Sequence, residues 1–363
     1  MKKIFLVDDS ALMRSVLSDI INSDSKFHVE ATARDGAEAL EMLKKSNSYD
    51  VMVLDVNMPK MNGIELLKKL NEEKIRIRTM MASTDTVEGA KVTMDALDLG
   101  AIDFVHKPDR ASACKGEDFT KEFLTTLWSV SISKLPTIVS VNKTEKPADK
   151  KIDKQIIQAV QKSAASITGN KIVAIASSTG GPRALQAVIP KLPKNLKAPV
   201  VLVQHMPVGF TASLATRLDS LSEIHVKEAA EGDELTRGTV YIAKGGIHMH
   251  IEKNPSGKFV IHFKDGPTRE GVKPSANFMY ESLANSSYDE VVCVVMTGMG
   301  ADGTEGIKNL KASKKVHVIS QDEESCTVYG MPRAVATAGL SNQVVSLDKI
   351  AQEIVMNVGV SGV

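Results

Sequence analysis

The amino-acid sequence predicts an α/β protein with two domains, each built on a doubly wound parallel sheet. Short apolar runs of strand length alternate with stretches whose apolar residues recur at helical spacing, and this alternation occurs twice along the 363 residues. Between the two patterns lies a charged segment, poor in bulky apolar side chains and typical of a linker, K-T-E-K-P-A-D-K-K-I-D-K. We therefore predict a first domain over residues 1–133, a flexible charged linker over 134–168 and a second domain over 169–360.

The composition fits ordinary globular domains. Apolar residues make up 43% of the chain and charged residues 25%, and a net charge of +1 gives no electrostatic case for nucleic acid or a membrane surface. No apolar run approaches the roughly 20 residues that span a bilayer, and Asp8 and Asp9 cut the N-terminal apolar run too short for an export signal. The three cysteines are far apart, so the sequence predicts no disulfide framework and a reducing, cytoplasmic location.

In the first domain, strands are predicted over Lys3–Val7, Val29–Ala31, Asp50–Leu54, Arg78–Ala82 and Ile102–Val105. Helices are predicted over residues 12–21, Gly36–Lys45, Ile64–Leu70, Val87–Leu99 and Asp118–Ser131. Strands that alternate with helices in this way form a parallel sheet, and the functional site of such a sheet lies at the carboxyl ends of its strands.

Three of these strand ends carry charged side chains, namely Asp8 with Asp9, Asp55, and Lys107. Carboxylates gathered at one edge of a sheet repel one another unless a cation joins them. Mg²⁺ takes oxygen ligands, and Lys107 would add a second positive centre. Such a site suits a phosphoryl group that lands on a carboxylate. Capping of the helix near Ser10 is the alternative role for an aspartate here, but it does not account for all four charged groups.

In the second domain, strands are predicted over Ile172–Ala176, Ala198–Val203, Glu290–Met296 and Val316–Ser320, with helices over Ala184–Leu192, Thr211–Leu221 and Thr304–Ala312. These elements again alternate, which predicts a second parallel sheet. In between, the pattern changes to strand and turn. We expect Thr239–Ala243 and His248–Glu252 to pair with Lys258–Phe263 as an antiparallel excursion across the turn N-P-S-G.

The first strand of this domain ends in S-S-T-G-G-P-R, a tight polar turn that leads into a helix. Such a turn holds a hydroxyl at the edge of the sheet beside unpaired backbone N–H groups, and we expect Ser178 to be a nucleophile. Ser177 is chemically equal, and strand alternation lets only one of the two face the site without saying which. A Gly-rich turn of this kind also serves as a phosphate cradle or as a plain tight turn.

Two further strand ends supply the partners that a serine nucleophile needs. His205 would take the proton of the serine hydroxyl, and Asp302, in the loop T-G-M-G-A-D-G, would orient the imidazole. Backbone N–H groups near the turn and in this loop would receive an oxyanion. The candidate oxyanion and substrate residues are Thr179, Gly298, Met299 and Gly300.

Each of these assignments has a simpler alternative. Asp302 could cap the helix that begins at Thr304. His205 is one of six histidines in the domain, and His248 and His250 share one strand face and could hold a metal, although no third ligand is evident. The order Ser, His, Asp and the lack of a G-x-S-x-G turn argue against a generic α/β-hydrolase.

The first domain carries the segments V-D-D-S, L-D-V-N-M-P-K-M-N-G and F-V-H-K-P. On these motifs, about residues 1–108 resemble a response-regulator receiver domain. The resemblance implies a flavodoxin-like fold in which Asp55 accepts a phosphoryl group, Lys107 contacts that group and a hydroxyl ending the fourth strand senses it. We choose Ser83 as the sensing hydroxyl, with the adjacent Thr84 as the alternative. The implied Mg²⁺ ligands are Asp8, Asp9 and Asp55.

The second domain carries, in this order, S-S-T-G-G, Q-H-M-P-V-G-F-T, Y-I-A, H-M, D-G-P, K-P-S, M-T-G-M-G-A-D-G and S-C-T-V-Y-G-M-P-R-A. About residues 171–355 therefore resemble the catalytic domain of the chemotaxis protein-glutamate methylesterases, which implies a Rossmann-like α/β fold. The resemblance implies that Ser178, directly before T-G-G, is the nucleophile, His205 the base and Asp302 its orienting acid. The family turn is normally G-A-S-T-G-G, and Ala176 and Ser177 replace its Gly and Ala here.

The resemblance implies a phosphorylation-activated enzyme of chemotactic adaptation. It would hydrolyse glutamate methyl esters on the cytoplasmic domains of chemoreceptors through an acyl-enzyme and release methanol, and some members also deamidate receptor glutamines. The implied partners are methylated chemoreceptors and a chemotaxis histidine kinase, without nucleic acid or membrane insertion, and we expect a monomer. Mg²⁺ is implied in the receiver domain, and no cofactor is expected in the catalytic domain. The alternative is a non-catalytic response regulator whose second domain binds a partner or a phosphorylated ligand.

Overall fold

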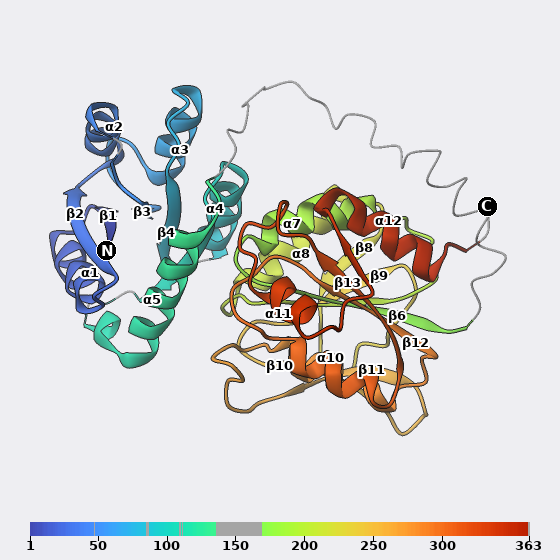
Figure 1. Cartoon of the computed structure of the whole chain (residues 1–363). Helices are drawn as coiled ribbons and strands as arrows, with labels where there is room; N and C mark the ends of the chain where they lie inside the picture. Colours follow the sequence, from blue (N-terminus) through green and yellow to red (C-terminus); the bar gives the residue numbers. More distant parts are fainter. Residues whose placement is uncertain (47, 85–86, 109, 111, 136–168, 362–363) are drawn as a thin grey trace. The chain divides into compact units, whose positions relative to one another are not determined.

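The computed structural model describes residues 1–46, 48–84, 87–108, 110, 112–135 and 169–361. The chain divides into two compact units, Met1–Glu145 and Lys146–Val363, and each contains its own parallel sheet (Figure 1). The predicted domain boundaries stay predictions, because most of the expected linker lies outside the described residues. Within the described residues, no helix is both long enough and apolar enough to cross a membrane.

The first unit contains a five-stranded parallel sheet with the order β2-β1-β3-β4-β5. Its strands are β1 (Lys2–Val7), β2 (Phe27–Ala33), β3 (Val51–Asp55), β4 (Arg78–Thr84) and β5 (Asp103–Lys107). Its helices are α1 (Ala11–Ser23), α2 (Gly36–Lys45), α3 (Gly63–Glu72), α4 (Val87–Asp98) and α5 (Glu117–Ile132), with the 3-10 turn η1 (Ala113–Lys115). Each predicted strand and helix of this unit is present within a few residues of its expected bounds, and the predicted fold is confirmed.

The two central strands of this sheet explain where its site lies. Residues 4–7 of β1 and all of β3 are buried, as expected of parallel strands that helices cover on both faces. From β1 the order runs outward to β2, and from β3 it runs outward through β4 to β5. The topology therefore reverses between β1 and β3, and the crevice at their carboxyl ends is where such sheets bind ligands.

The second unit contains a seven-stranded sheet with the order β14-β13-β12-β6-β7-β9-β8, in which each neighbouring pair is parallel. The strands of this sheet are β6 (Lys171–Ser177), β7 (Val200–Gln204), β8 (His225–Glu228), β9 (Thr239–Ile242), β12 (Glu290–Val295), β13 (Lys315–Gln321) and β14 (Gln343–Val345). Its topology reverses between β6 and β12. The predicted parallel sheet is confirmed.

Helices cover both faces of this sheet. They are α7 (Gly181–Val188), α8 (Phe210–Leu221), α9 (Ala276–Ser282), α10 (Thr304–Lys311), α11 (Met331–Thr337) and α12 (Leu347–Val358), with the 3-10 turns η3 (Ile189–Lys191) and η4 (Leu283–Asn285). Figure 1 shows α7, α8 and α12 on one side of the sheet and α10, which contacts α9 and α11, on the other. Met279 and Tyr280 of α9 pack into the buried core with Ile172, Val201 and Val291 of the sheet.

The antiparallel excursion is smaller than predicted. β10 (His248–Lys253) and β11 (Phe259–Lys264) form a two-stranded antiparallel sheet, as expected. The expectation that Thr239–Ala243 joins them is wrong, because these residues form β9 inside the parallel sheet. All four residues of β9 are buried, which suits a strand covered on both faces. The helix predicted to reach Leu192 ends at Val188, shortly before Pro190, which has no N–H to extend the helical ladder.

One buried carboxylate joins the amino ends of three neighbouring strands in the second unit. Glu290 begins β12 and lies opposite Lys171 of β6 and Lys315 of β13. Its Oε2 atom is 2.8 Å from the Lys171 ammonium and 3.2 Å from that of Lys315. Burial acts to raise the pKa of the Glu290 carboxyl, but the hydrogen bonds and charges of the two lysines prevail, and the pKa lies below its ordinary value.

Glu290→Gln removes the charge that the two lysines share. We expect it to lower the free energy of unfolding of the second unit by about 1–2 kcal/mol at neutral pH. Because the folded-state pKa is depressed, this stabilisation is full above the unfolded-state pKa and is lost as the pH falls through the folded-state pKa. Urea unfolding of both proteins should therefore show a difference that shrinks toward acid pH.

The matched control is Glu305→Gln, which removes an exposed carboxylate 3.5 Å from Lys308. It should change the free energy of unfolding by less than about 0.5 kcal/mol. A Glu290→Gln difference that stays constant from neutral to acid pH would contradict the assigned role of the carboxylate.

Candidate active site

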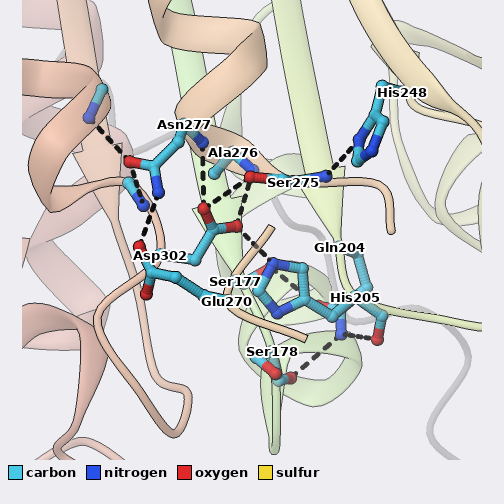
Figure 2. Close-up of polar contacts among 12 residues, drawn as sticks. Ser177, Ser178, Gln204, His205, His248, Glu270, Ser275, Ala276, Asn277 and Asp302 are labelled. Carbon is cyan, nitrogen blue, oxygen red and sulfur yellow. Dashed lines mark hydrogen bonds and ion pairs between the residues drawn. The ribbon is translucent and has the colours of Figure 1, made fainter. Parts of the chain in front are cut away.

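Three loops meet where the strand order of the second unit reverses. Ser178 follows β6, His205 follows β7, and Asp302 lies in the loop after β12 (Figure 2). Backbone hydrogen bonds extend the sheet into these loops: Ser178 N donates to Thr297 O at 3.0 Å, and His205 N donates to Ser177 O at 3.1 Å. The three predicted residues are therefore brought together from strand ends that are far apart in the sequence.

His205 and Asp302 form a hydrogen-bonded pair. The Nε2 atom of His205 is 2.8 Å from Oδ2 of Asp302, and both side chains are at most one-tenth exposed. An ionised carboxylate only accepts, so Nε2 carries the shared proton and Nδ1 is left as the basic nitrogen of the ring. Figure 2 shows the imidazole between Asp302 and Ser178. Within the described residues the Ser178 hydroxyl makes no hydrogen bond, as is common before a substrate binds.

The Asp302 carboxylate is held at the amino end of α9. It accepts hydrogen bonds from the Ser275 hydroxyl at 2.7 Å and from the backbone N–H groups of Ala276 at 2.6 Å and Asn277 at 3.0 Å. Burial acts to raise the pKa of Asp302, but its hydrogen bonds and the His205 ring outweigh burial, and the pKa is lowered. The carboxylate is therefore ionised near neutral pH and fixed in place.

Asn277 in turn binds the loop that carries Asp302. Its Oδ1 accepts from the backbone N–H groups of Gly303 at 3.0 Å and Gly306 at 2.6 Å, at the start of α10. Its Nδ2 donates to Glu270 at 2.8 Å. Each helix thus has its first turn capped by a side chain from the other segment. The alternative role of Asp302 as a cap on its own helix is wrong, since that cap is Asn277.

The nucleophile turn is closely packed against the loop after β12. A Cβ atom on Gly298 would lie 2.7 Å from Cβ of Ser178, so only glycine fits there. The Gly298 N–H donates to Val328 O at 3.0 Å and is therefore not an oxyanion donor, which corrects the role expected of it. The N–H groups of Met299 and Gly300 make no hydrogen bond within the part of the chain that is described. Thr179 is buried beside Ser178.

The two serines of the turn differ in their surroundings. Ser177 is fully buried, and its hydroxyl donates to Oε1 of Gln204 at 2.7 Å. Ser178 is partly exposed at the end of the strand. The geometry therefore favours Ser178 as the residue that can meet a substrate.

His248 is engaged in structure rather than in metal binding. Its Nε2 atom lies 3.0 Å from Pro267 O, and its Nδ1 atom accepts from the N–H of Ser275 at 3.2 Å. Both ring nitrogens are thus used, and the histidine pair considered as a metal site is wrong. His248 supports Ser275, which in turn donates to Asp302. Sequence reasoning missed the roles of Ser275, Asn277 and Gln204, because no sequence pattern identifies the distant residues that they bind.

The first unit gathers its predicted charged residues at the reversal point of its own sheet. Oxygen atoms of Asp8, Asp9 and Asp55 all lie within 4.8 Å of one another. The ammonium of Lys107 is 2.7 Å from Asp8 Oδ2 and 2.9 Å from Asp55 Oδ1. Burial raises the pKa of Asp55 to about 6, and the charge of Asp8 adds to this, although Lys107 opposes it. One ammonium faces three carboxylates in this cluster, so the carboxylates are not fully compensated and their oxygens suit Mg²⁺.

The switch hydroxyl stays a prediction. Ser83 is buried on β4, one residue beyond Ala82, which pairs with Asp55 of β3. The strand extends to Thr84, whose side chain lies outside the described residues.

Comparison with known proteins relates both units to characterised families. The model of the CheB methylesterase family matches residues 173–354, and that of the response regulator receiver domain matches residues 4–115. A protein-glutamate methylesterase/protein-glutamine glutaminase of Bacillus subtilis (strain 168) is 41% identical over 360 residues, which cover 98% of each chain. A protein of the same name from Pyrococcus abyssi is 42% identical, covering 97% of this chain and 92% of its own. The crystal structure of the Thermotoga maritima CheB methylesterase catalytic domain is 43% identical, with a TM-score of 0.50 over 52% of this chain and 98% of its own.

Asn277→Ala leaves the N–H groups of Gly303 and Gly306 without their acceptor and Glu270 without its donor. We expect a loss of about 2–4 kcal/mol in the free energy of unfolding of the second unit. Thermal or urea unfolding measures this loss. The control is Asn309→Ala, which removes an exposed amide of α10 that lies 2.7 Å from Glu281 of α9. It should have a much smaller effect. Equal effects of the two substitutions would contradict the capping role.

Proposed function

This chain belongs to the CheB methylesterase family, with a receiver domain ahead of the catalytic domain, and we propose that it demethylates chemoreceptor glutamates through Ser178, His205 and Asp302. Relatives that match almost its whole length are named protein-glutamate methylesterase/protein-glutamine glutaminase, so the enzyme class is that of a carboxylic ester and amide hydrolase. The observation that carries the proposed mechanism is the 2.8 Å His205–Asp302 pair beside the partly exposed Ser178.

The proposed reaction proceeds through an acyl-enzyme. Ser178 Oγ attacks the carbonyl carbon of the methyl ester while Nδ1 of His205 takes the hydroxyl proton. The proton then passes to the leaving methoxide, and methanol departs. Water attacks the acyl-enzyme with His205 again as the base, the ester bond to Ser178 breaks, and Oγ recovers its proton. The products are a glutamate side chain, methanol and the free enzyme.

The supporting groups follow from their geometry. Asp302 stabilises the imidazolium that forms on His205, because its own pKa is lowered and it stays ionised. The N–H groups of Met299 and Gly300 are the proposed donors to the oxyanion, with Thr179 beside the nucleophile. Glutamine deamidation follows the same steps with ammonia as the first leaving group, which suits the double name of the relatives.

The first unit is proposed to regulate this reaction. Oδ1 of Asp55 accepts hydrogen bonds from Val56 N at 2.9 Å and from Lys107. The other oxygen, Oδ2, is therefore the proposed acceptor of a phosphoryl group from a chemotaxis histidine kinase. Asp8, Asp9 and Asp55 would hold Mg²⁺, which when bound neutralises charge on the transferred group. Lys107 would bind the phosphoryl oxygens, and Ser83 would respond to them.

A non-catalytic second domain that cradles an anion is the rival function. Such a cradle needs the turn at Ser178 and its backbone N–H groups. It does not need a buried His205–Asp302 pair whose carboxylate is held by three further hydrogen bonds. The catalytic proposal explains that arrangement and is preferred.

Ser178→Ala removes the proposed nucleophile. We expect methanol release from methylated receptor membranes to fall by about 10⁴-fold or more, with an unchanged unfolding transition. Ser220→Ala, which alters an exposed hydroxyl on α8, is the control and should retain activity. Substantial methanol release by Ser178→Ala would eliminate the acyl-enzyme mechanism.

Asp55→Asn removes the proposed phosphoryl acceptor in the first unit. Acetyl phosphate with Mg²⁺ should stimulate methanol release by the unmodified protein, and this stimulation should disappear in the variant while its unstimulated activity remains. Asp19→Asn, on the exposed side of α1, should keep the stimulation. If Asp55→Asn were stimulated as strongly as the control, Asp55 would not be the regulatory site.

A further inference from the structure

A single buried amide links the backbones of the proposed nucleophile and base. Gln204 ends β7 and is 2% exposed. Its Nε2 atom donates to the carbonyl oxygen of Ser178 at 3.0 Å and to that of His205 at 3.1 Å (Figure 2). Both amide hydrogens are therefore used, one on each of the two residues that must meet during the reaction.

The carbonyl oxygens of Ser178 and His205 set the direction in which this amide points, because a carbonyl oxygen only accepts, and Ser177 completes the arrangement. Its hydroxyl donates to Oε1 of Gln204 at 2.7 Å, in a position with no access to water. If the amide were turned over, Oε1 would face the carbonyl oxygens of Ser178 and His205, and both carbonyls would lose this donor, although the Ser177 hydroxyl could still accept from the amide. That loss is costly in a buried site, so the two carbonyls select the orientation in which Oε1 accepts from the Ser177 hydroxyl.

The first turn of α7 seals the amide in place. A Cβ atom on Gly181 would lie 1.9 Å from Oε1 of Gln204 and 3.0 Å from Cβ of Ser177. The N–H of Gly181 also donates to Ser178 O at 2.6 Å. The carbonyl of the nucleophile thus accepts two hydrogen bonds, one from its own turn and one from the neighbouring strand.

The Gln204 amide connects the two chain segments just beyond the last backbone hydrogen bond between β6 and β7. The last backbone bond between the two strand ends runs from His205 N to Ser177 O, and Ser178 lies beyond it. Within the described residues, the Gln204 side chain makes the only hydrogen bond between β7 and the backbone of Ser178. The side chain therefore continues the connection between β6 and β7 by one residue.

We propose that Gln204 is a positioning residue that fixes Ser178 relative to His205, and that Ser177 acts through it. The inference rests on the proposed catalytic roles of Ser178 and His205 and adds two residues that never touch the substrate. We call Ser177, Gln204 and the two carbonyls the amide clamp.

The first test replaces the amide by a side chain of similar length without hydrogen-bonding groups. In Gln204→Met we expect kcat for methanol release to fall by about tenfold to a hundredfold, with KM within about twofold, because small displacements of catalytic groups have effects of this order. Ser177→Ala should lower kcat by less. The double variant should be no slower than Gln204→Met, since Ser177 acts only through the amide.

The second test separates positioning from mere folding by its pH dependence. The carboxyl introduced by Gln204→Glu can donate to a carbonyl only when protonated, and burial beside two carbonyl oxygens favours protonation. We expect its kcat relative to the unmodified protein to rise as the pH falls, while the same ratio for Gln204→Met stays flat. A purely structural role predicts the same pH dependence for both variants wherever both are folded.

Two readouts keep the outcomes distinct. Labelling of Ser178 by a serine-directed fluorophosphonate probe reports on the nucleophile itself and should slow in Gln204→Met in step with kcat. The control is Ser320→Ala, a fully buried hydroxyl on β13 that is 2.7 Å from Ser341, and it should label at the unmodified rate. Should Gln204→Met fail to fold, Ser177→Ala and Gln204→Glu carry the test.

The amide clamp is overturned if Gln204→Met keeps kcat within about twofold, or if the two substitutions multiply in the double variant. The proposed function fails differently. In that case Ser178→Ala would still release methanol, or the unmodified protein would neither release methanol nor take up the probe.

Discussion

The second unit depends on one buried carboxylate, that of Asp302. It receives four hydrogen bonds, one from the His205 ring and three from the start of α9. Because α9 returns its own Asn277 amide to the start of α10, the acid, its loop and two helices form one hydrogen-bonded structure. A carboxylate in a buried site is costly unless it is fully paired. Here the pairing that satisfies the charge also fixes the imidazole.

The two units use the same topological solution for different chemistry. In each, the strand order reverses between two buried central strands, and the residues that carry the proposed function follow their carboxyl ends. The first unit places carboxylates and a lysine there, which suits a cation and a phosphoryl group. The second places a hydroxyl, an imidazole and a carboxylate there, which suits acyl transfer. Sheet topology thus gives the location, and side chains at the strand ends give the reaction.

The sequence predicted the strand ends because buried parallel strands are continuous apolar runs that stop abruptly at polar residues. Asp55 and His205 could be found in this way, and Asp302 as a polar residue of the loop that follows β12. The residues that hold them could not be found, since Ser275 and Asn277 bind residues that are distant in the sequence. The periodicity of a sequence does not identify such partners. The sheet to which Thr239–Ala243 belongs is not predictable for the same reason, because a short apolar run does not identify its neighbouring strands. The hydroxyl of Ser177, which replaces the alanine of the family turn, has a structural reason only in its hydrogen bond to Gln204.

The reciprocal caps of α9 and α10 have a consequence for descent within this family. Asp302 has two roles, because it orients His205 and also accepts hydrogen bonds from the N–H groups at the start of α9. A lineage that abandoned hydrolysis would remain under pressure to keep this aspartate, whereas the partly exposed Ser178 hydroxyl, which makes no hydrogen bond within the described residues, would be released. A divergent sequence that keeps only Asp302 therefore indicates that the fold is kept. A sequence that also keeps Ser178 is the better indication of hydrolytic activity.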